Sequence, residues 1–165
     1  MLFKIMTSSI FKKDLYKHIE LREGCKKVVY LDTLGKPTGG IGHLLTKKEV
    51  ELYPVGTELS DKVVNEWYQE DIEEALDACN SQCTLLGLYD KEFKIALTSV
   101  NFQLGTKWYR KFPKAWKHLC HKKYQEAVDE IMYYDKEKQE YSLWYKQTPV
   151  RVLDFVNAIK DIIGE

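Results

Sequence analysis

Apolar residues recur every three or four positions along most of the chain, which is the spacing of one face of a helix. The clearest case runs from Ser60 to Leu76, where Ser60 is a suitable N-cap. Pro149 stands at the start of the last such segment, where proline is tolerated. The pattern predicts a mainly helical protein, with helices over about residues 14–23, 47–52, 60–76, 91–103, 114–120, 124–133, 142–146 and 149–163.

Residues 28–40 depart from this helical spacing. They begin with a short β-rich run and continue into turn-forming residues, which predicts a β-hairpin. The period of two in the first strand puts Tyr30 and Asp32 on one face, and the returning strand carries Thr38. Three glycines in and after that strand let the backbone come close to a neighbour or a ligand: Gly39, Gly40 and Gly42.

Two acids stand in different surroundings around this hairpin. Glu23 ends the helix for which Asp14 is a suitable N-cap, and Gly24 follows as a C-terminal stop. The negative end of the helix dipole favours a protonated carboxyl group there, so Glu23 suits a proton donor. Asp32 is the candidate for the ionised carboxyl group, and the alternative is that it only forms the turn. One protonated and one ionised carboxyl group are what cleavage of a glycosidic bond requires.

This segment resembles the catalytic core of the phage-type lysozymes, the muramidase family. In that family a glutamate at a helix end, an aspartate, a threonine and a G-I-G-H-L-L run follow one another at fixed spacing. The matching residues here are, without gaps, Glu23, Asp32, Thr38 and residues 40–45. Residues 100–105 resemble the family's central-helix segment, and residues 144–151 resemble its late W-Y-x-Q-T-P-x-R segment. The resemblance extends from about residue 14 to about residue 162.

The resemblance implies an α+β, mainly helical, lysozyme-like fold. A small N-terminal β-hairpin lobe is joined by a long helix to a helical C-terminal lobe, and residues 1–165 form a single lysozyme domain. The expected parts are an N-terminal extension at 1–13, a hairpin lobe at about 24–59, an interlobe helix at about 60–80 and a helical lobe at about 81–165.

The resemblance also implies catalytic roles. Glu23 is expected to protonate the leaving oxygen of the glycosidic bond. Asp32, together with Thr38, is expected to position or activate the attacking water, which implies inversion of configuration.

Other residues of these blocks are expected to bind substrate or to support the site. Leu44 and Phe102 match cleft positions of the family. Two further candidates for substrate binding, with packing as the alternative, are Gln103 and Gln147. His43 titrates near neutral pH, but a structural histidine paired with a carboxylate is the preferred interpretation. The resemblance implies Asp71 as its partner.

Three features depart from the family pattern. Gly39 stands where a larger apolar residue is common, which predicts a looser strand. Ala115 and Glu130 stand where close relatives bind sugar through Ser and Asn, so the distal subsites are expected to differ. Residues 131–142 form a longer, charged connection, which is either inert or shapes one rim of the cleft.

Composition narrows the possible partners. The net charge is zero, yet residues 93–125 contain no acid and many lysines. A basic face that steers the protein to an anionic wall and a merely solvated face are equally compatible with this stretch. It holds no nucleic-acid-binding motif, so no nucleic-acid partner is expected. The four cysteines match no zinc pattern and are expected to be free, and no metal or organic cofactor is expected.

The first 13 residues are too short for a signal peptide or a membrane span, so no stable membrane insertion is expected. The resemblance implies a monomeric phage endolysin made in the host cytoplasm. It would act on the cell wall in the periplasm after release by a holin-type protein.

The predicted function is therefore hydrolysis of the β-1,4 bond between N-acetylmuramic acid and N-acetylglucosamine in bacterial peptidoglycan, with lysis of the host cell. One alternative is a lytic transglycosylase, which uses a single glutamate and lets the sugar's own hydroxyl attack. The presence of both Asp32 and Thr38 argues against it. The other alternative is a non-catalytic wall-binding module, which has no need of intact catalytic residues.

Overall fold

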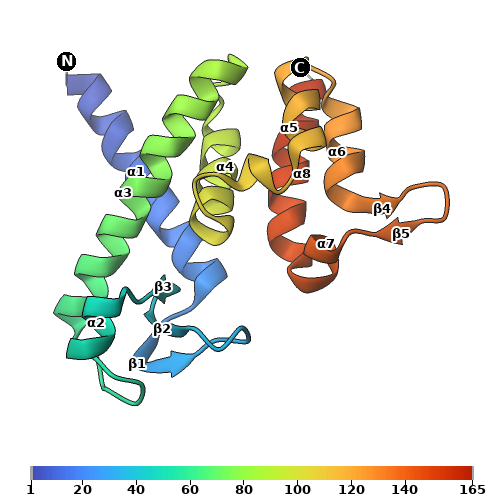
Figure 1. Ribbon diagram of the computed structural model, residues 1–165. Helices are drawn as coiled ribbons and strands as arrows, with labels where there is room; N and C mark the ends of the chain where they lie inside the picture. Colours follow the sequence, from blue (N-terminus) through green and yellow to red (C-terminus); the bar gives the residue numbers. More distant parts are fainter. Residues whose placement is uncertain (1, 165) are drawn as a thin grey trace. The chain divides into compact units, whose positions relative to one another are not determined.

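The computed structural model describes residues 2–164, with side chains from residue 9 onward. The chain forms two compact units, Met1–Glu74 and Ala75–Glu165, and the division falls within the long helix α3 (Asp61–Leu86; Figure 1). The predicted α+β, mainly helical fold is confirmed, because a small antiparallel sheet and this long helix accompany the remaining helices.

The first unit is built around a three-stranded antiparallel sheet. Its elements are, in chain order, α1 (Leu2–Glu23), β1 (Lys26–Leu31), β2 (Pro37–Gly40), β3 (His43–Leu44), α2 (Lys47–Leu52) and the first part of α3. Strand β2 is central, so that Thr38 pairs with Tyr30 on one side and with Leu44 on the other. The Ser60 hydroxyl accepts the N–H of Val63, which is the cap predicted for α3.

Helix α1 begins earlier than the sequence pattern predicts. Asp14 is no N-cap, because the backbone of residues 2–13 is helical and continuous with the rest of α1. The physical reason is that no glycine or proline interrupts the chain between Leu2 and Glu23. Met1, which also belongs to the expected extension, lies outside the described residues.

A compact apolar core holds the first unit together. It gathers side chains from α1, the sheet region and α3: Leu15, Ile19, Val29, Ile41, Leu59, Val64, Trp67 and Ile72. Gly39 lies within it, and a Cβ there would stand 2.8 Å from Leu59 Cδ1 and 3.6 Å from Val29 Cγ2. The expectation of a looser strand at Gly39 is therefore wrong, since neighbouring side chains already fill the space.

The second unit is helical and encloses the larger core. After the end of α3 come α4 (Lys91–Leu104), η1 (Trp108–Arg110), α5 (Pro113–Cys120), α6 (Tyr124–Met132), β4 (Tyr133–Asp135), β5 (Glu140–Tyr141), α7 (Leu143–Gln147) and α8 (Pro149–Ile163). The bounds of these helices agree with the apolar periodicity to within a residue or two.

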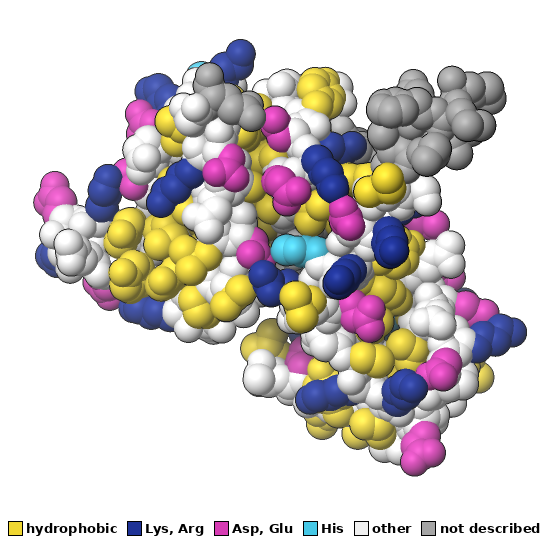
Figure 2. All heavy atoms as spheres, turned by 180° about the vertical axis from the view of Figure 1, so that it is seen from behind, with side chains coloured by type: hydrophobic (Ala, Val, Ile, Leu, Met, Phe, Trp, Pro, Cys, Tyr) yellow, Lys and Arg dark blue, Asp and Glu magenta, His cyan; other side chains and the backbone are white. Residues whose placement is uncertain are grey.

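Within residues 131–142, the segment Tyr133–Tyr141 forms a β-hairpin instead of an irregular charged loop. Strands β4 and β5 pair antiparallel, and the ring of Tyr133 stacks on Tyr141 at 5.3 Å between centroids. Tyr141 stacks in turn on Tyr145 of α7 at 4.5 Å. Aromatic cross-strand pairs stabilise short hairpins, which explains the order of this segment. Hydrophobic side chains gather on the side of the second unit that carries the hairpin (Figure 2).

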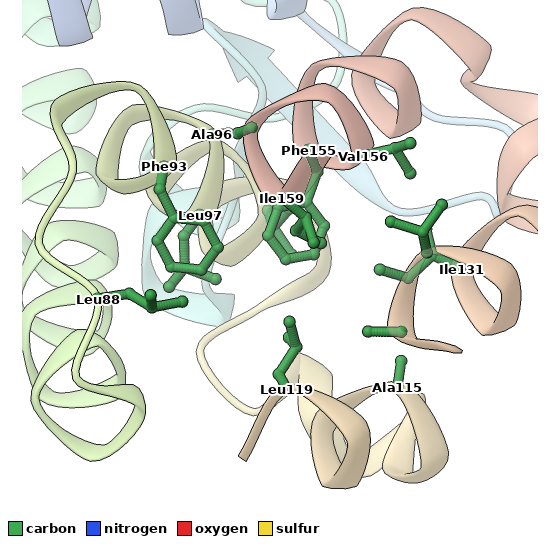
Figure 3. Packing of buried hydrophobic residues seen from close by; sticks show 14 of the residues in the cluster. Leu88, Phe93, Ala96, Leu97, Ala115, Leu119, Ile131, Phe155, Val156 and Ile159 are labelled. Atoms are coloured by element: carbon green, nitrogen blue, oxygen red, sulfur yellow. The ribbon is translucent and has the colours of Figure 1, made fainter. Parts of the chain in front are cut away.

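The core of the second unit packs α4 and α8 against α5 and α6. Fully buried side chains from all four helices meet there, as Figure 3 shows for Leu97, Leu119, Ile131, Phe155 and Ile159. Such burial contributes roughly 1.5–3 kcal/mol for each large apolar side chain.

The structure holds Cys25, Cys79, Cys83 and Cys120 as free thiols. The sulfur atoms of Cys79 and Cys83, one turn apart on α3, lie 3.8 Å from each other. Within residues 2–164, the structure has no helix that is both long and apolar enough to span a membrane.

Candidate active site

Glu23 is the last residue of α1, and its half-buried side chain lies against the backbone of Gly42. A Cβ at Gly42 would stand 2.8 Å from Glu23 Oε2 and 3.0 Å from its Cδ. Gly42 also has φ 66°, a backbone conformation that favours glycine. Gly24 closes the helix, because its N–H donates to the Glu20 carbonyl at 2.8 Å. One glycine thus ends the helix at Glu23, and the other makes room for the carboxyl group.

Asp32 follows β1 and organises the hairpin turn. Its Oδ1 accepts the N–H of Leu34 and the N–H of Lys36, each at 2.8 Å. Its own backbone N–H donates to the Lys36 carbonyl at 2.9 Å. The turn-forming role considered for Asp32 is therefore present in the structure. Both side-chain bonds end on Oδ1, so the carboxylate is held in one orientation and Oδ2 takes no part in the turn.

Thr38 is buried in the central strand, with 6% of its surface exposed. Its hydroxyl donates to the Lys36 carbonyl at 3.1 Å. Asp32 and Thr38 therefore hold the same residue, one through its N–H and the other through its carbonyl. The two side chains are linked through Lys36, and this arrangement fixes the hairpin beside the Gly42 loop on which Glu23 rests.

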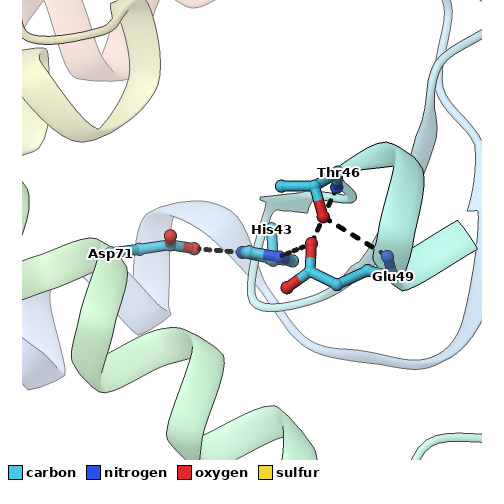
Figure 4. Close-up of polar contacts among 4 residues, drawn as sticks. All are labelled: His43, Thr46, Glu49 and Asp71. Atoms are coloured by element: carbon cyan, nitrogen blue, oxygen red, sulfur yellow. Dashed lines mark hydrogen bonds and ion pairs between the residues drawn. The ribbon is translucent and has the colours of Figure 1, made fainter. Parts of the chain in front are cut away.

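His43 of β3 is held between two carboxylates (Figure 4). Its Nδ1 lies 2.7 Å from Asp71 Oδ2 of α3, and its Nε2 lies 3.2 Å from Glu49 Oε2 of α2. The imidazole ring also stacks on Trp67, with 4.4 Å between ring centroids. Burial acts to lower the pKa of His43, but hydrogen bonds and charge from Asp71 and Glu49 outweigh it and leave the pKa raised.

Glu49 was not among the residues singled out from the sequence. It closes the capping box of α2: Thr46 N–H donates to Glu49 Oε2 at 2.7 Å, and Glu49 N–H donates to the Thr46 hydroxyl at 3.3 Å. Burial acts to raise the pKa of Glu49, and the bonds from Thr46 together with His43 lower it below its ordinary value. The T-x-x-E pattern at residues 46–49 was a visible signal for the cap, although not for the contact with His43.

Replacing His43 by asparagine is expected to lower the Tm by roughly 4–8 °C, because two carboxylates lose their cation at a cost of about 2 kcal/mol. Much of the enzymatic activity should persist, since the ring faces Asp71 and Glu49 and not Glu23. A folded variant without any activity would contradict a structural role.

The pH dependence of this stabilisation follows from the two pKa shifts. The raised pKa of His43 means that its contribution is complete below the ordinary histidine pKa and is lost as the pH rises through the raised value. The lowered pKa of Glu49 means that its contribution is lost as the pH falls through that lowered value. The difference in Tm between wild type and the His43→Asn variant should therefore narrow at both ends of a pH series measured by calorimetry.

Replacing Gly42 by alanine is expected to lower kcat of the glycosidic cleavage expected from the sequence by about 10²-fold, because the new Cβ displaces the Glu23 carboxyl group. Backbone strain at positive φ adds about 1–2 kcal/mol of destabilisation. Gly87→Ala is the matched control, since Gly87 has φ 68° and no neighbouring atom within 4 Å of the added Cβ. Equal activity in the two alanine variants would show that Glu23 does not depend on Gly42.

The predicted substrate-binding residues have different surroundings. Leu44 is 51% exposed beside Thr38. Phe102 is half-buried on α4. The Gln103 amide is engaged at both ends: its oxygen accepts the Trp144 indole N–H, and its nitrogen donates to the Thr148 hydroxyl, each at 3.2 Å. The packing role considered for Gln103 is thus present in the second unit.

Gln147 lines a pocket of about 440 Å³ that sequence reasoning did not identify. The pocket lies within the second unit and is hereafter called the Trp144 pocket. Its apolar walls are formed by Phe112, Tyr133, Tyr134, Leu143 and Trp144. Its volume falls in the range typical of small-molecule sites.

The basic stretch begins on α4 with Lys94, and its remaining basic residues, from Lys107 to Lys123, fall on η1, on α5 and on the turns beside them. Ala115 and Leu119 bury one side of α5, while Lys114 and Lys117 are exposed. Among the residues with described side chains, no ion pair is formed by Lys107, Arg110, Lys111, Lys114, Lys117, Lys122 or Lys123. Their charge is not neutralised locally, which is what a steering surface requires.

Comparisons with known proteins agree with this geometry. The phage lysozyme family model matches residues 20–146, and the chain belongs to that family. It is 30% identical to a probable T4-type lysozyme 2 of Dictyostelium discoideum, over 88% of this chain and 90% of that protein. It is 29% identical to a probable T4-type lysozyme 1 of the same organism, over 94% of this chain and 95% of that protein.

The family resemblance predicted from the sequence is therefore confirmed. Membership in a lysozyme family makes this protein a glycoside hydrolase with peptidoglycan as the substrate class. These two relatives come from Dictyostelium discoideum, so they carry no information about a phage origin.

Proposed function

We propose that this protein is a muramidase that hydrolyses the β-1,4 bond between N-acetylmuramic acid and N-acetylglucosamine. The observation that carries the proposal is the presence, within the first unit, of two carboxyl groups that are held in different ways. Glu23 rests on Gly42 at the end of α1, and Asp32 is fixed by two backbone N–H groups at the hairpin turn.

In this mechanism Glu23 gives its proton to the leaving glycosidic oxygen. Asp32 directs a water to the opposite face of the sugar through Oδ2, the oxygen that the turn does not use. Thr38 supports this step by holding Lys36, and thereby the hairpin, in place. Attack by water from the opposite face gives inversion of configuration at the anomeric carbon.

The substrate contacts are part of the same proposal. Leu44 is exposed in the strand next to Thr38, so it is available to a sugar ring. Phe102 and Gln147 are proposed to contact the glycan or its peptide, and Gln103 to hold Trp144 in position for that contact. His43 and Asp71 support the fold and do not touch the substrate.

The cellular setting is proposed from the resemblance alone. The protein is proposed to be a monomeric endolysin that is present in the host cytoplasm after synthesis. A holin-type protein would release it to the wall in the periplasm, and lysis of the host would follow. The unpaired lysines of α5 would aid its capture by an anionic wall.

Digestion of purified peptidoglycan tests the proposed chemistry. The expected products have reducing N-acetylmuramic acid ends, and proton NMR during the reaction should show the α-anomer first. Products with 1,6-anhydro ends would identify a lytic transglycosylase instead. Wall binding without any cleavage would identify a non-catalytic module.

A further inference from the structure

Two partly exposed aromatic side chains lie next to each other on η1 and α5. The rings of Tyr109 and Trp116 are 5.3 Å apart between centroids and tilted by 34°. Trp108 is fully buried, and its ring meets that of Trp116 edge-on at 5.8 Å. Trp108 is itself fixed, because its indole N–H donates to Gln82 Oε1 at 3.1 Å. The aromatic pair is therefore held in place before any ligand arrives.

Three exposed basic residues stand within two positions of this aromatic pair in the chain: Lys107, Arg110 and Lys117. None of them forms an ion pair with a side chain described in residues 9–164. None of the chain's 25 acidic residues lies between Phe93 and Gln125, so no acid of the same segment offsets these charges. The basic and aromatic groups together are hereafter called the η1–α5 surface, which consists of Lys107, Tyr109, Arg110, Trp116 and Lys117.

The η1–α5 surface is separate from the residues that are proposed to act on the scissile bond. It shares no residue with the Trp144 pocket, and Glu23 and Asp32 belong to the first unit. A ligand of this surface therefore need not be the sugar chain that is being cleaved.

The chemistry of the surface fits an anionic glycan. A pyranose ring has an apolar C–H face that packs on an aromatic ring, and carboxylates form charge-assisted hydrogen bonds with lysine and arginine. Peptidoglycan offers both groups, since its stem peptides carry free carboxylates. A lipid surface requires apolar side chains that insert, whereas Tyr109 and Trp116 pack against the core and are only partly exposed. A wall polymer is therefore a better fit than a membrane.

We propose that the η1–α5 surface binds a second strand of peptidoglycan, next to the strand that the protein cleaves. Sugar rings pack on Tyr109 and Trp116, and stem-peptide carboxylates bind Lys107, Arg110 and Lys117. Such a contact retains the protein on an insoluble wall between cleavage events. The inference rests on the proposed function for its choice of ligand, and it adds a binding surface that takes no part in the bond cleavage.

Co-sedimentation of the full-length protein with insoluble peptidoglycan sacculi tests the basic residues. Every protein carries Glu23→Gln, so that the walls are not digested during the measurement. Arg110→Gln/Lys117→Gln is the test variant, and Lys48→Gln/Lys160→Gln is the matched control, because all four residues are exposed and each pair removes two positive charges. The test variant should bind about tenfold more weakly, and the control should bind like the parent. The difference should disappear in about 1 M salt, where the Debye length is about 3 Å.

The aromatic ring is tested at Tyr109. Tyr109→Leu removes the ring but keeps an apolar side chain against the core, and Tyr109→Phe keeps the ring. The leucine variant should bind sacculi about tenfold more weakly, and the phenylalanine variant should bind like the parent. Thermal melting shows whether each variant is folded. The exposed residues Arg110 and Lys117 test the surface even if the leucine variant does not fold.

The inference is overturned if the Arg110→Gln/Lys117→Gln variant binds sacculi as tightly as its control, or if a folded Tyr109→Leu variant binds as tightly as Tyr109→Phe. Equal or tighter binding of the parent protein to vesicles of phosphatidylglycerol and phosphatidylcholine in equal parts would overturn it in favour of a membrane surface. Sedimentation does not depend on turnover. Wall cleavage by the wild type without any effect of these variants on binding would refute the inference alone, and surface-dependent binding without wall cleavage would refute the proposed function alone.

Discussion

Replacing Glu23 by glutamine is expected to lower kcat for wall hydrolysis by about 10²–10⁴-fold, which is the usual contribution of one general acid. Glutamine keeps the size of the side chain, and therefore its place against Gly42. It has no acidic proton to give to the leaving oxygen, so the bond must break without protonation. Clearing of a suspension of purified walls measures the loss.

Glu20→Gln is the matched control for this experiment. Glu20 is exposed in the same last turn of α1, so its substitution removes one negative charge from the helix end without touching Gly42. Its activity should equal that of the wild type, and thermal melting should show both variants folded. Substantial turnover by the Glu23→Gln variant would remove Glu23 from the role of proton donor.

Local signals in the sequence were sufficient for most of the helices. The capping box at Thr46 and the N-terminal Pro149 fix where α2 and α8 begin, because each satisfies or removes a backbone N–H at that point. Such signals act within a few residues, and they are therefore readable without a structure. The same kind of short-range spacing predicted the first hairpin, in which Thr38 lies on the strand that returns from Asp32.

Predictions failed where two local signals competed. Asp14 has the composition of an N-cap, but an unbroken run without glycine or proline lets α1 extend back to Leu2. The charged residues between Tyr133 and Tyr141 suggested a loop, yet the aromatic pair at its two ends closes a hairpin. In both cases residues further along the chain decided between two local structures: a later or an earlier start of α1, and a loop or a hairpin at residues 133–141.

Partners from separate elements were the hardest to foresee. Glu49 had a sufficient local explanation as part of a capping box, and its second contact with His43 arises only when α2 folds against β3. The Trp144 pocket likewise combines residues from α4 to α7 that share no sequence motif. A sequence pattern records spacing along one element, and a pocket depends on the packing of several.

Replacing Asp32 by asparagine is expected to lower kcat by about 10²-fold or more while leaving the hairpin folded. Both backbone N–H groups of the turn donate to Oδ1, and the amide oxygen of asparagine accepts the same two bonds. The substitution therefore removes the charge that directs the water and retains the turn. Wall-clearing assays measure the rate, and the Tm reports the integrity of the hairpin.

Two further variants distinguish the role of Asp32 as the hydrogen-bond acceptor of the turn from the role of its negative charge. Asp32→Ala removes the acceptor as well as the charge, so it should lose activity and also about 1–2 kcal/mol of stability. Asp135→Asn is the matched control, because Asp135 accepts the Lys138 N–H in the turn of the second hairpin. It tests the same chemical change at the turn of a different hairpin, in the second unit, and it should leave the rate of wall clearing unchanged.

Full activity in the Asp32→Asn variant, together with a loss of stability in Asp32→Ala, would assign Asp32 to the turn alone. Thr38 would then lose its proposed part in water placement, since its hydroxyl reaches the Lys36 carbonyl and acts only through the hairpin that Asp32 shapes. The reaction would need a nucleophile other than a water directed by Asp32. Attack by the sugar's own hydroxyl is the available choice, so 1,6-anhydro products from this variant and from the wild type would be the decisive companion measurement.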